Sequence, residues 1–147
     1  MLKNILKGKV VIVGIGNVLK GDDGFGPALV GRLLGKTKAL CIDAGTAPEN
    51  YTGKIVKAEP DTILLVDAAH LDLPPGRYQV LKPDEILKSG FTTHDMSPRM
   101  FMEFVGSQTH AAIYMLGVQP ERMAFGDEMS DTLKKTLDEI TEELGNA

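Results

Sequence analysis

With 147 residues, the chain is long enough to bury about 70% of its unfolded surface in one core, so we expect a single domain over residues 1–147. Hydrophobic residues make up 43% of the sequence and charged residues 24%, as is typical of a globular protein. The net charge of −4 at pH 7 argues against nucleic acid or an anionic membrane as a partner.

Cysteine usage and the N-terminal segment both predict a cytoplasmic protein. Cys41 is the only cysteine, so it cannot form an intrachain disulfide, and it lies in an apolar run typical of the core. Residues 1–10 contain lysines but neither an uninterrupted apolar segment nor a cleavage signal, so we expect no export and no membrane span. We expect a monomer that acts in the cytoplasm.

Short apolar runs alternate with amphipathic segments along the chain. The apolar runs predict strands at residues 10–13, 39–42, 62–66, 77–81 and 111–116. The amphipathic segments predict helices at residues 27–34, 98–105 and 131–144, with a weaker helix at 49–58. We expect Leu34 in the first helix, and Phe101, Phe104 and Val105 in the second, to face the core.

This alternation predicts an α/β fold: a three-layer α/β/α sandwich around a mainly parallel, mixed five-stranded sheet. Because crossover connections are right-handed, the carboxyl ends of the strands should meet at one edge of the sheet. That edge would collect the carboxylates of Asp22, Asp23, Asp43 and Asp67. His94 would reach it from a loop that precedes a helix.

The stretch from Val10 to Pro27 joins the first strand to the first helix through a loop rich in glycine. A dinucleotide-binding loop would need a third glycine where this chain has Leu19, and two carboxylates would repel a pyrophosphate. We expect Gly26 to cap the helix, which places Asp22 and Asp23 too far upstream for capping. At least one of these acids therefore needs another role.

Two carboxylates and an imidazole at one edge allow two kinds of chemistry. They form a ligand set that suits a divalent transition metal and leaves coordination positions open. Alternatively, two neighbouring carboxylates can share a proton and activate water, as in aspartic proteases. The residues themselves do not separate these two hypotheses. No serine or cysteine lies in a nucleophile-elbow pattern.

Four motifs, in this order, resemble the maturation endopeptidases of [NiFe] hydrogenases, and most closely the hydrogenase 3 type. They are GIGNVLKGDDGFG after the first strand, IDAGTAPEN, LLVDAA, and TTHDM before a helix. The resemblance implies an aspartic-type peptidase that cleaves a C-terminal extension from a large-subunit precursor once nickel is in place. It implies that nickel, supplied by the precursor, contacts Asp23, Asp67 and His94, which are also the catalytic residues.

The same resemblance implies a substrate-binding segment at Asp43, Gly45 and Thr46. One difference from the family pattern is Asp23, because many members have a glutamate at this position. Aspartate is expected in the hydrogenase 3 type, and its shorter side chain would hold a metal nearer the backbone. The alternative hypothesis is a chaperone that binds nickel or the precursor without cutting it.

Overall fold

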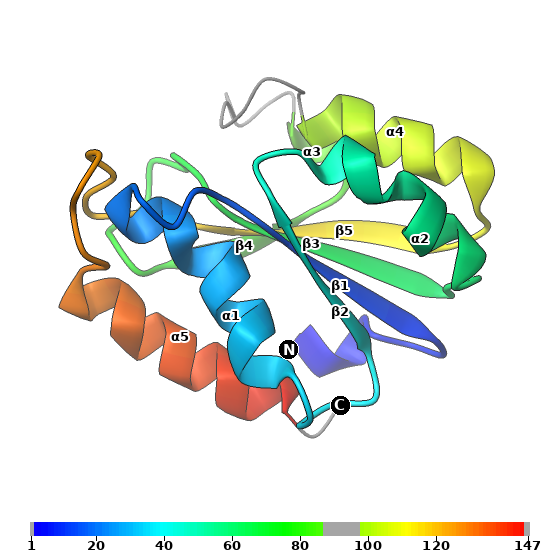
Figure 1. Cartoon of the computed structure of the whole chain (residues 1–147), viewed down its shortest axis with the longest axis horizontal. Coiled ribbons are helices and arrows are strands. Elements are labelled where there is room, and N and C mark those ends of the chain that lie inside the picture. The colour runs from blue at the N-terminus through cyan, green and yellow to red at the C-terminus, as the bar shows by residue number, and fades with distance from the viewer. Residues whose placement is uncertain (1, 87–97, 146–147) are drawn as a thin grey trace.

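The computed structural model describes residues 2–86 and 98–145, and within these ranges it contains a five-stranded sheet of order β2-β1-β3-β5-β4 (Figure 1). The strands are β1 Val10–Ile15, β2 Leu40–Gly45, β3 Thr62–Ala68, β4 Tyr78–Leu81 and β5 Ala112–Val118. All neighbouring strands pair in parallel except β4, which runs antiparallel to β5 at one edge. The expected mainly parallel, mixed sheet is confirmed.

Helices cover both faces of this sheet, which confirms the three-layer sandwich. They are α1 Phe25–Leu33, α2 Thr52–Lys57, α3 Pro83–Ile86, α4 Pro98–Gln108 and α5 Asp131–Leu144, with short 3-10 helices η1 Leu2–Asn4, η2 Gly21–Gly24 and η3 Pro48–Tyr51. α1 and α5 lie on one face, and α2, α3 and α4 lie on the other (Figure 1). Among the helices in the described ranges, none is both long and apolar enough to cross a membrane.

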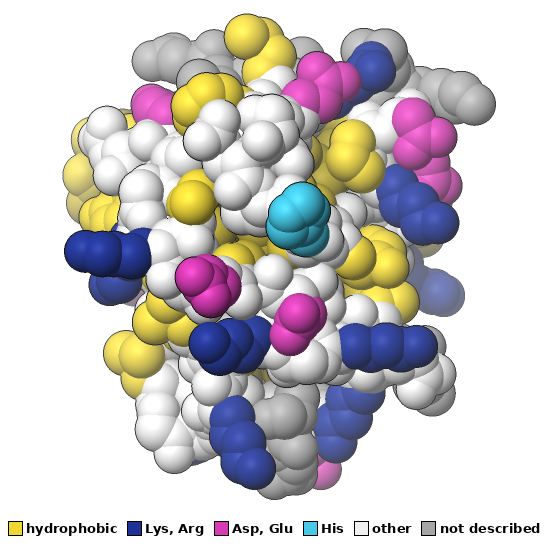
Figure 2. All heavy atoms as spheres, turned by 90° about the vertical axis from the view of Figure 1, so that its right-hand side faces the viewer, with side chains coloured by type: hydrophobic (Ala, Val, Ile, Leu, Met, Phe, Trp, Pro, Cys, Tyr) yellow, Lys and Arg dark blue, Asp and Glu magenta, His cyan; other side chains and the backbone are white. Residues whose placement is uncertain are grey.

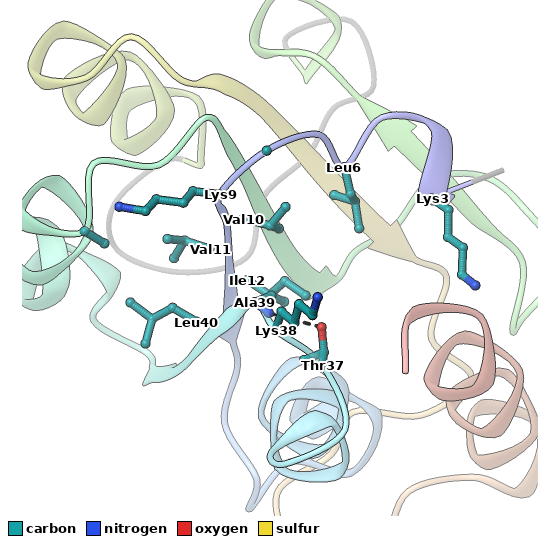
Figure 3. Close-up of a pocket in the computed structure, with 12 residues that line it drawn as sticks. Lys3, Leu6, Lys9, Val10, Val11, Ile12, Thr37, Lys38, Ala39 and Leu40 are labelled. Carbon is teal, nitrogen blue, oxygen red and sulfur yellow. Dashed lines mark hydrogen bonds between the residues drawn. The ribbon is translucent and has the colours of Figure 1, made fainter. Parts of the chain in front are cut away.

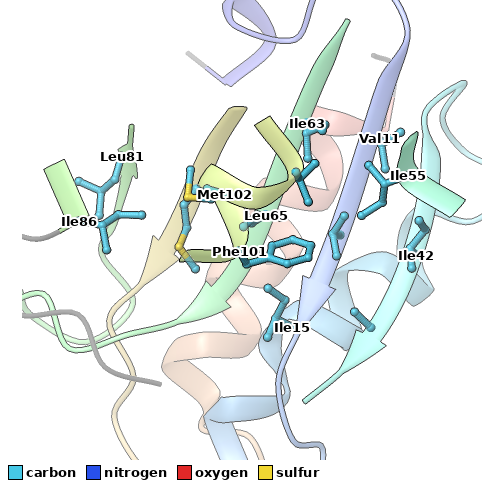
Figure 4. Close-up of a cluster of buried hydrophobic side chains, with 14 of the residues drawn as sticks. Val11, Ile15, Ile42, Ile55, Ile63, Leu65, Leu81, Ile86, Phe101 and Met102 are labelled. Carbon is cyan, nitrogen blue, oxygen red and sulfur yellow. The ribbon is translucent and has the colours of Figure 1, made fainter. Parts of the chain in front are cut away.

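Side chains that alternate along the strands build one hydrophobic cluster on each face. On one face, Phe101 and Met102 of α4 and Ile55 of α2 pack against strand residues such as Val11 and Leu65 (Figure 4). On the other face, α1 and α5 pack against a second set of strand residues that includes Ile12, Leu64, Val66 and Leu116. The sheet is therefore buried on both faces, as its β-branched runs predict.

Two expectations about inward-facing residues are wrong. Phe104 is 51% exposed, because α4 turns Phe101, Met102 and Val105 inward and this phase leaves Phe104 on the outer side. Leu34 is 62% exposed, because α1 ends at Leu33 and the backbone leaves the helical conformation at the next residue. In both cases the residue is apolar and has the spacing of a buried helical position, but spacing alone does not show where the helix ends or which side faces the sheet.

Candidate active site

The loop that follows β1 places two carboxylates in the 3-10 helix η2, directly before α1. Asp22 is fully buried and Asp23 is 6% exposed. α1 begins at Phe25 with Gly24 as its N-cap, so the expectation that Gly26 caps the helix is wrong. Because Pro27 lies within the first turn, where its missing N–H removes no helical bond, the helix can start before it.

Close backbone packing fixes this loop against the ends of β1 and β3. A Cβ atom added to Gly26 would lie 2.4 Å from the Val66 carbonyl oxygen and 2.5 Å from that of Ile15. A Cβ atom added to Gly16 would lie 1.8 Å from the carbonyl oxygen of Asp23. Only glycine therefore allows the first turn of α1 and the acidic loop to lie so close to the carboxyl ends of the strands.

The Asp22 carboxylate holds a distant loop in place. It accepts hydrogen bonds from the backbone N–H groups of Glu121 (2.8 Å), Arg122 (2.9 Å) and Ser130 (2.7 Å), and from the Ser130 hydroxyl (2.9 Å). The Ser130 hydroxyl oxygen in turn accepts from the N–H of Leu133 and caps α5. These four bonds give Asp22 a structural role, which separates it from Asp23.

Asp23 lies in a loop shaped by Asn17. Its Oδ2 atom accepts a hydrogen bond from the Asn17 N–H at 2.9 Å. The Asn17 side-chain oxygen accepts from the Leu19 N–H at 2.9 Å, which closes the turn after Gly16. Sequence reasoning did not assign a role to Asn17, although an asparagine after a glycine is a common turn signal.

Asp67 lies on β3 near its carboxyl end and is fully buried. The strand continues to Ala68, beyond the predicted end at residue 66, because Asp67 still pairs with Gly117 of β5. η2 packs against β3, so Asp23 and Asp67 come to the same edge of the sheet, as the topology predicted. Two buried carboxyl groups at the carboxyl edge of a parallel sheet occupy the usual position of a ligand site.

Asp43 belongs to the same edge but faces the other side of the sheet. It pairs with Gly14, which also pairs with Val66, so Asp43 and Val66 point to the same face. Asp67 is the next residue after Val66 and therefore points to the opposite face. Asp43 is exposed, and its Oδ1 atom accepts a hydrogen bond from the Gly45 N–H at 3.1 Å.

His94 lies outside the described residues, so its predicted place beside the two carboxylates stays a prediction. Within residues 2–86 and 98–145, no group of three or more His, Cys, Asp or Glu side chains is arranged to hold a metal ion. His70 and His110 are both exposed, which confirms that they are surface residues. A metal site with three ligands at this edge would therefore need a ligand from outside the described ranges.

A cavity of about 680 Å³ lies at the opposite edge, near the amino ends of β1 and β2. Its described lining is mainly apolar and includes Lys3, Lys9 and Lys38, with none of the predicted site residues (Figure 3). Figure 2 views the molecule from this end and shows several Lys and Arg side chains in its lower half, near acidic side chains. Lysines and aliphatic groups do not supply the carboxylate chemistry described above, so this cavity is not the candidate site.

Comparison with known proteins gives a consistent result. A family model described as HycI, hydrogenase maturation protease, matches residues 28–147. A Methanocaldococcus jannaschii protein described as a candidate hydrogenase maturation protease is 36% identical over 92% of this chain and 90% of its own length. The hydrogenase 3 maturation protease of Escherichia coli is 31% identical over 91% of this chain and 87% of its own length.

The fold agrees with these sequence matches. The crystal structure of the [NiFe] hydrogenase maturation protease HycI from Thermococcus kodakarensis superposes with a TM-score of 0.90 at 31% identity. The superposition covers 98% of this chain and 96% of that one. The chain belongs to the family of hydrogenase maturation proteases and is an endopeptidase.

Proposed function

We propose that this endopeptidase removes a C-terminal extension from the large-subunit precursor of a [NiFe] hydrogenase after nickel has been inserted. Membership of the family supports this substrate class, and the E. coli relative is named for hydrogenase 3. The structural observation that carries the proposal is the pair of buried carboxyl groups, Asp23 and Asp67, at the carboxyl edge of the sheet.

In this proposal the nickel ion is part of the substrate. Asp23, Asp67 and His94 contact it and fill coordination positions that the precursor leaves open. Without a thiolate, these three residues alone would bind a divalent ion weakly and with little selectivity. A precursor without nickel therefore lacks the bridge that positions its scissile bond, and a misplacement of about 1 Å can lower a rate on the order of a hundredfold.

Asp43, Gly45 and Thr46 are the proposed substrate-binding segment. Asp43 and Thr46 are exposed, and β2 is an edge strand of the sheet. An edge strand offers unpaired backbone N–H and C=O groups that an extended peptide can bind. The carboxylate of Asp43 adds a charged group that can distinguish between substrates.

Hydrolysis adds water to the carbonyl carbon of the scissile peptide bond, breaks the C–N bond and transfers a proton to the leaving amine. Asp23 and Asp67 supply carboxyl groups that can accept the proton of water and return it to the amine. Because both are buried, bulk water competes less for these groups than it would at an exposed site.

The decisive experiment compares cleavage of nickel-loaded and nickel-free precursor, with a chelator added to the nickel-free sample. Mass spectrometry would detect the loss of the C-terminal peptide. We expect rapid cleavage of the loaded precursor and at least a hundredfold slower cleavage of the other. Equal rates would contradict nickel recognition and favour a mechanism in which Asp23 and Asp67 share a proton.

We further propose that the protein acts in the cytoplasm as a monomer with one domain over residues 1–147. Its single cysteine, Cys41, is partly buried and free, which suits a reducing compartment. Size-exclusion chromatography with light scattering would test the monomer, and an apparent dimer mass would contradict it.

A further inference from the structure

Two loops that are far apart in sequence are joined beside Asp23. The Gly126 N–H donates to the Leu19 carbonyl oxygen at 2.8 Å, and the Gly21 N–H donates to the Asp127 carbonyl oxygen at 3.1 Å. The Asp22 carboxylate, just after the first loop, also accepts from Glu121 and Arg122 of the second loop and twice from Ser130, just after that loop. The loops of residues 16–20 and 121–129 therefore form one continuous surface.

This surface exposes three large apolar side chains. Val18 is 64% exposed, Leu19 57% and Phe125 73%. Exposed apolar residues are common singly, but here two are consecutive on one loop, and the third precedes Gly126, whose N–H bonds Leu19. Because well-ordered backbone hydrogen bonds hold both loops, the exposure does not come from a loop without contacts.

The exposed residues are continuous with the candidate active site. A Cβ atom added to Gly24, the residue after Asp23, would lie 3.0 Å from the Cα atom of Val18. An extended peptide advances about 3.3 Å per residue. An extended chain whose scissile bond lies at Asp23 can therefore reach Val18 and Leu19 within about two or three residues.

We propose that Val18, Leu19 and Phe125 form a docking surface for an apolar segment of the precursor next to the bond that is cut, and that Asp22 is the positioning residue that holds this surface together. The inference rests on the proposed function and adds a substrate preference to it. The precursor should carry apolar side chains within a few residues of its cleavage site, since these would bury the exposed surface.

The test measures kcat and KM for nickel-loaded precursor with the variants Leu19→Ser and Phe125→Ser. Leu34→Ser is the matched control, because Leu34 is 62% exposed at the far end of α1 and undergoes the same chemical change. Each docking variant should raise KM about tenfold with kcat unchanged, as expected for the loss of one buried apolar contact. The control should keep the KM of the unaltered protein.

The outcomes separate this inference from the proposed function. If the unaltered protein cleaves the precursor but both docking variants keep its KM, the docking surface is wrong and the proposed function stands. A fall in kcat at constant KM would also overturn docking, because it indicates a role in the chemical step. If the unaltered protein leaves the nickel-loaded precursor intact, the proposed function fails and the docking surface fails with it.

Discussion

Replacing Asp22 by alanine should destabilise the protein far more than replacing any other acid of the 16–24 loop. The carboxylate is fully buried and accepts four hydrogen bonds, two of them from Ser130 in a buried environment. Removing a hydrogen bond to a charged group costs about 1.5–3 kcal/mol. The N–H groups of Glu121 and Arg122 are only partly buried, so in the variant they can form hydrogen bonds with water and lose less. We therefore expect a loss of about 3–5 kcal/mol in the free energy of unfolding.

Urea unfolding followed by circular dichroism measures this loss directly. For a chain of this size, it corresponds to a decrease in Tm of roughly 10 °C. Asp43→Ala is the control, because Asp43 is exposed and the hydrogen bond that it accepts from the Gly45 N–H stays within its own turn, so the change should be about 0.5 kcal/mol. A loss below about 1 kcal/mol for Asp22→Ala would refute the assignment of Asp22 as the anchor of the 121–129 loop.

Three further outcomes follow. Asp23→Ala, Asp67→Ala and His94→Ala should each abolish cleavage of nickel-loaded precursor while the far-ultraviolet circular dichroism stays that of the unaltered protein, and a variant that cleaves at the normal rate removes its residue from the proposed site. Asp43→Ala should weaken precursor binding by roughly 1.5–3 kcal/mol or broaden the range of precursors that are cleaved. Unchanged affinity and selectivity in a competition assay would exclude Asp43 from the substrate-binding segment. Burial raises the pKa of the Cys41 thiol, so less thiolate is present at about pH 8 in the folded protein. Iodoacetamide should therefore react more slowly with the folded protein than with the urea-unfolded protein, and equal rates would contradict this expectation.

The sheet and the position of the acid pair could be predicted because both depend on local patterns and general rules of topology. The run Thr62–Ala68 reads as a buried strand from its residues alone, and parallel strands bring their carboxyl ends to one edge. Asp67 lies at the predicted carboxyl edge, although the strand continues one residue past it. A polar residue near the end of a strand interrupts the apolar pattern, so the sequence predicts an end that lies before the last hydrogen-bonded pair of the strand.

The role of Asp22 and the direction of Asp43 could not be predicted in the same way. The partners of Asp22 lie 99 to 108 positions further along the chain, and no local pattern connects them. The direction of Asp43 depends on the register of β2 against β1, which shifts between Gly14 and Ile15. Long-range contacts and register are properties of the assembled sheet, so a single sequence carries little signal for them.

The bond between Asp22 and Ser130 also affects when the enzyme can become active during its synthesis. The loop that carries Asp23 is synthesised before its anchor, because Asp22 bonds Ser130, the N-cap residue of α5, 108 positions further along the chain. The N-terminal segment is held in the same way, since the Leu2 N–H donates to Glu143 at 2.7 Å. A nascent chain that does not yet include Ser130 and α5 would therefore lack a fixed active edge, so it should be inert as a peptidase.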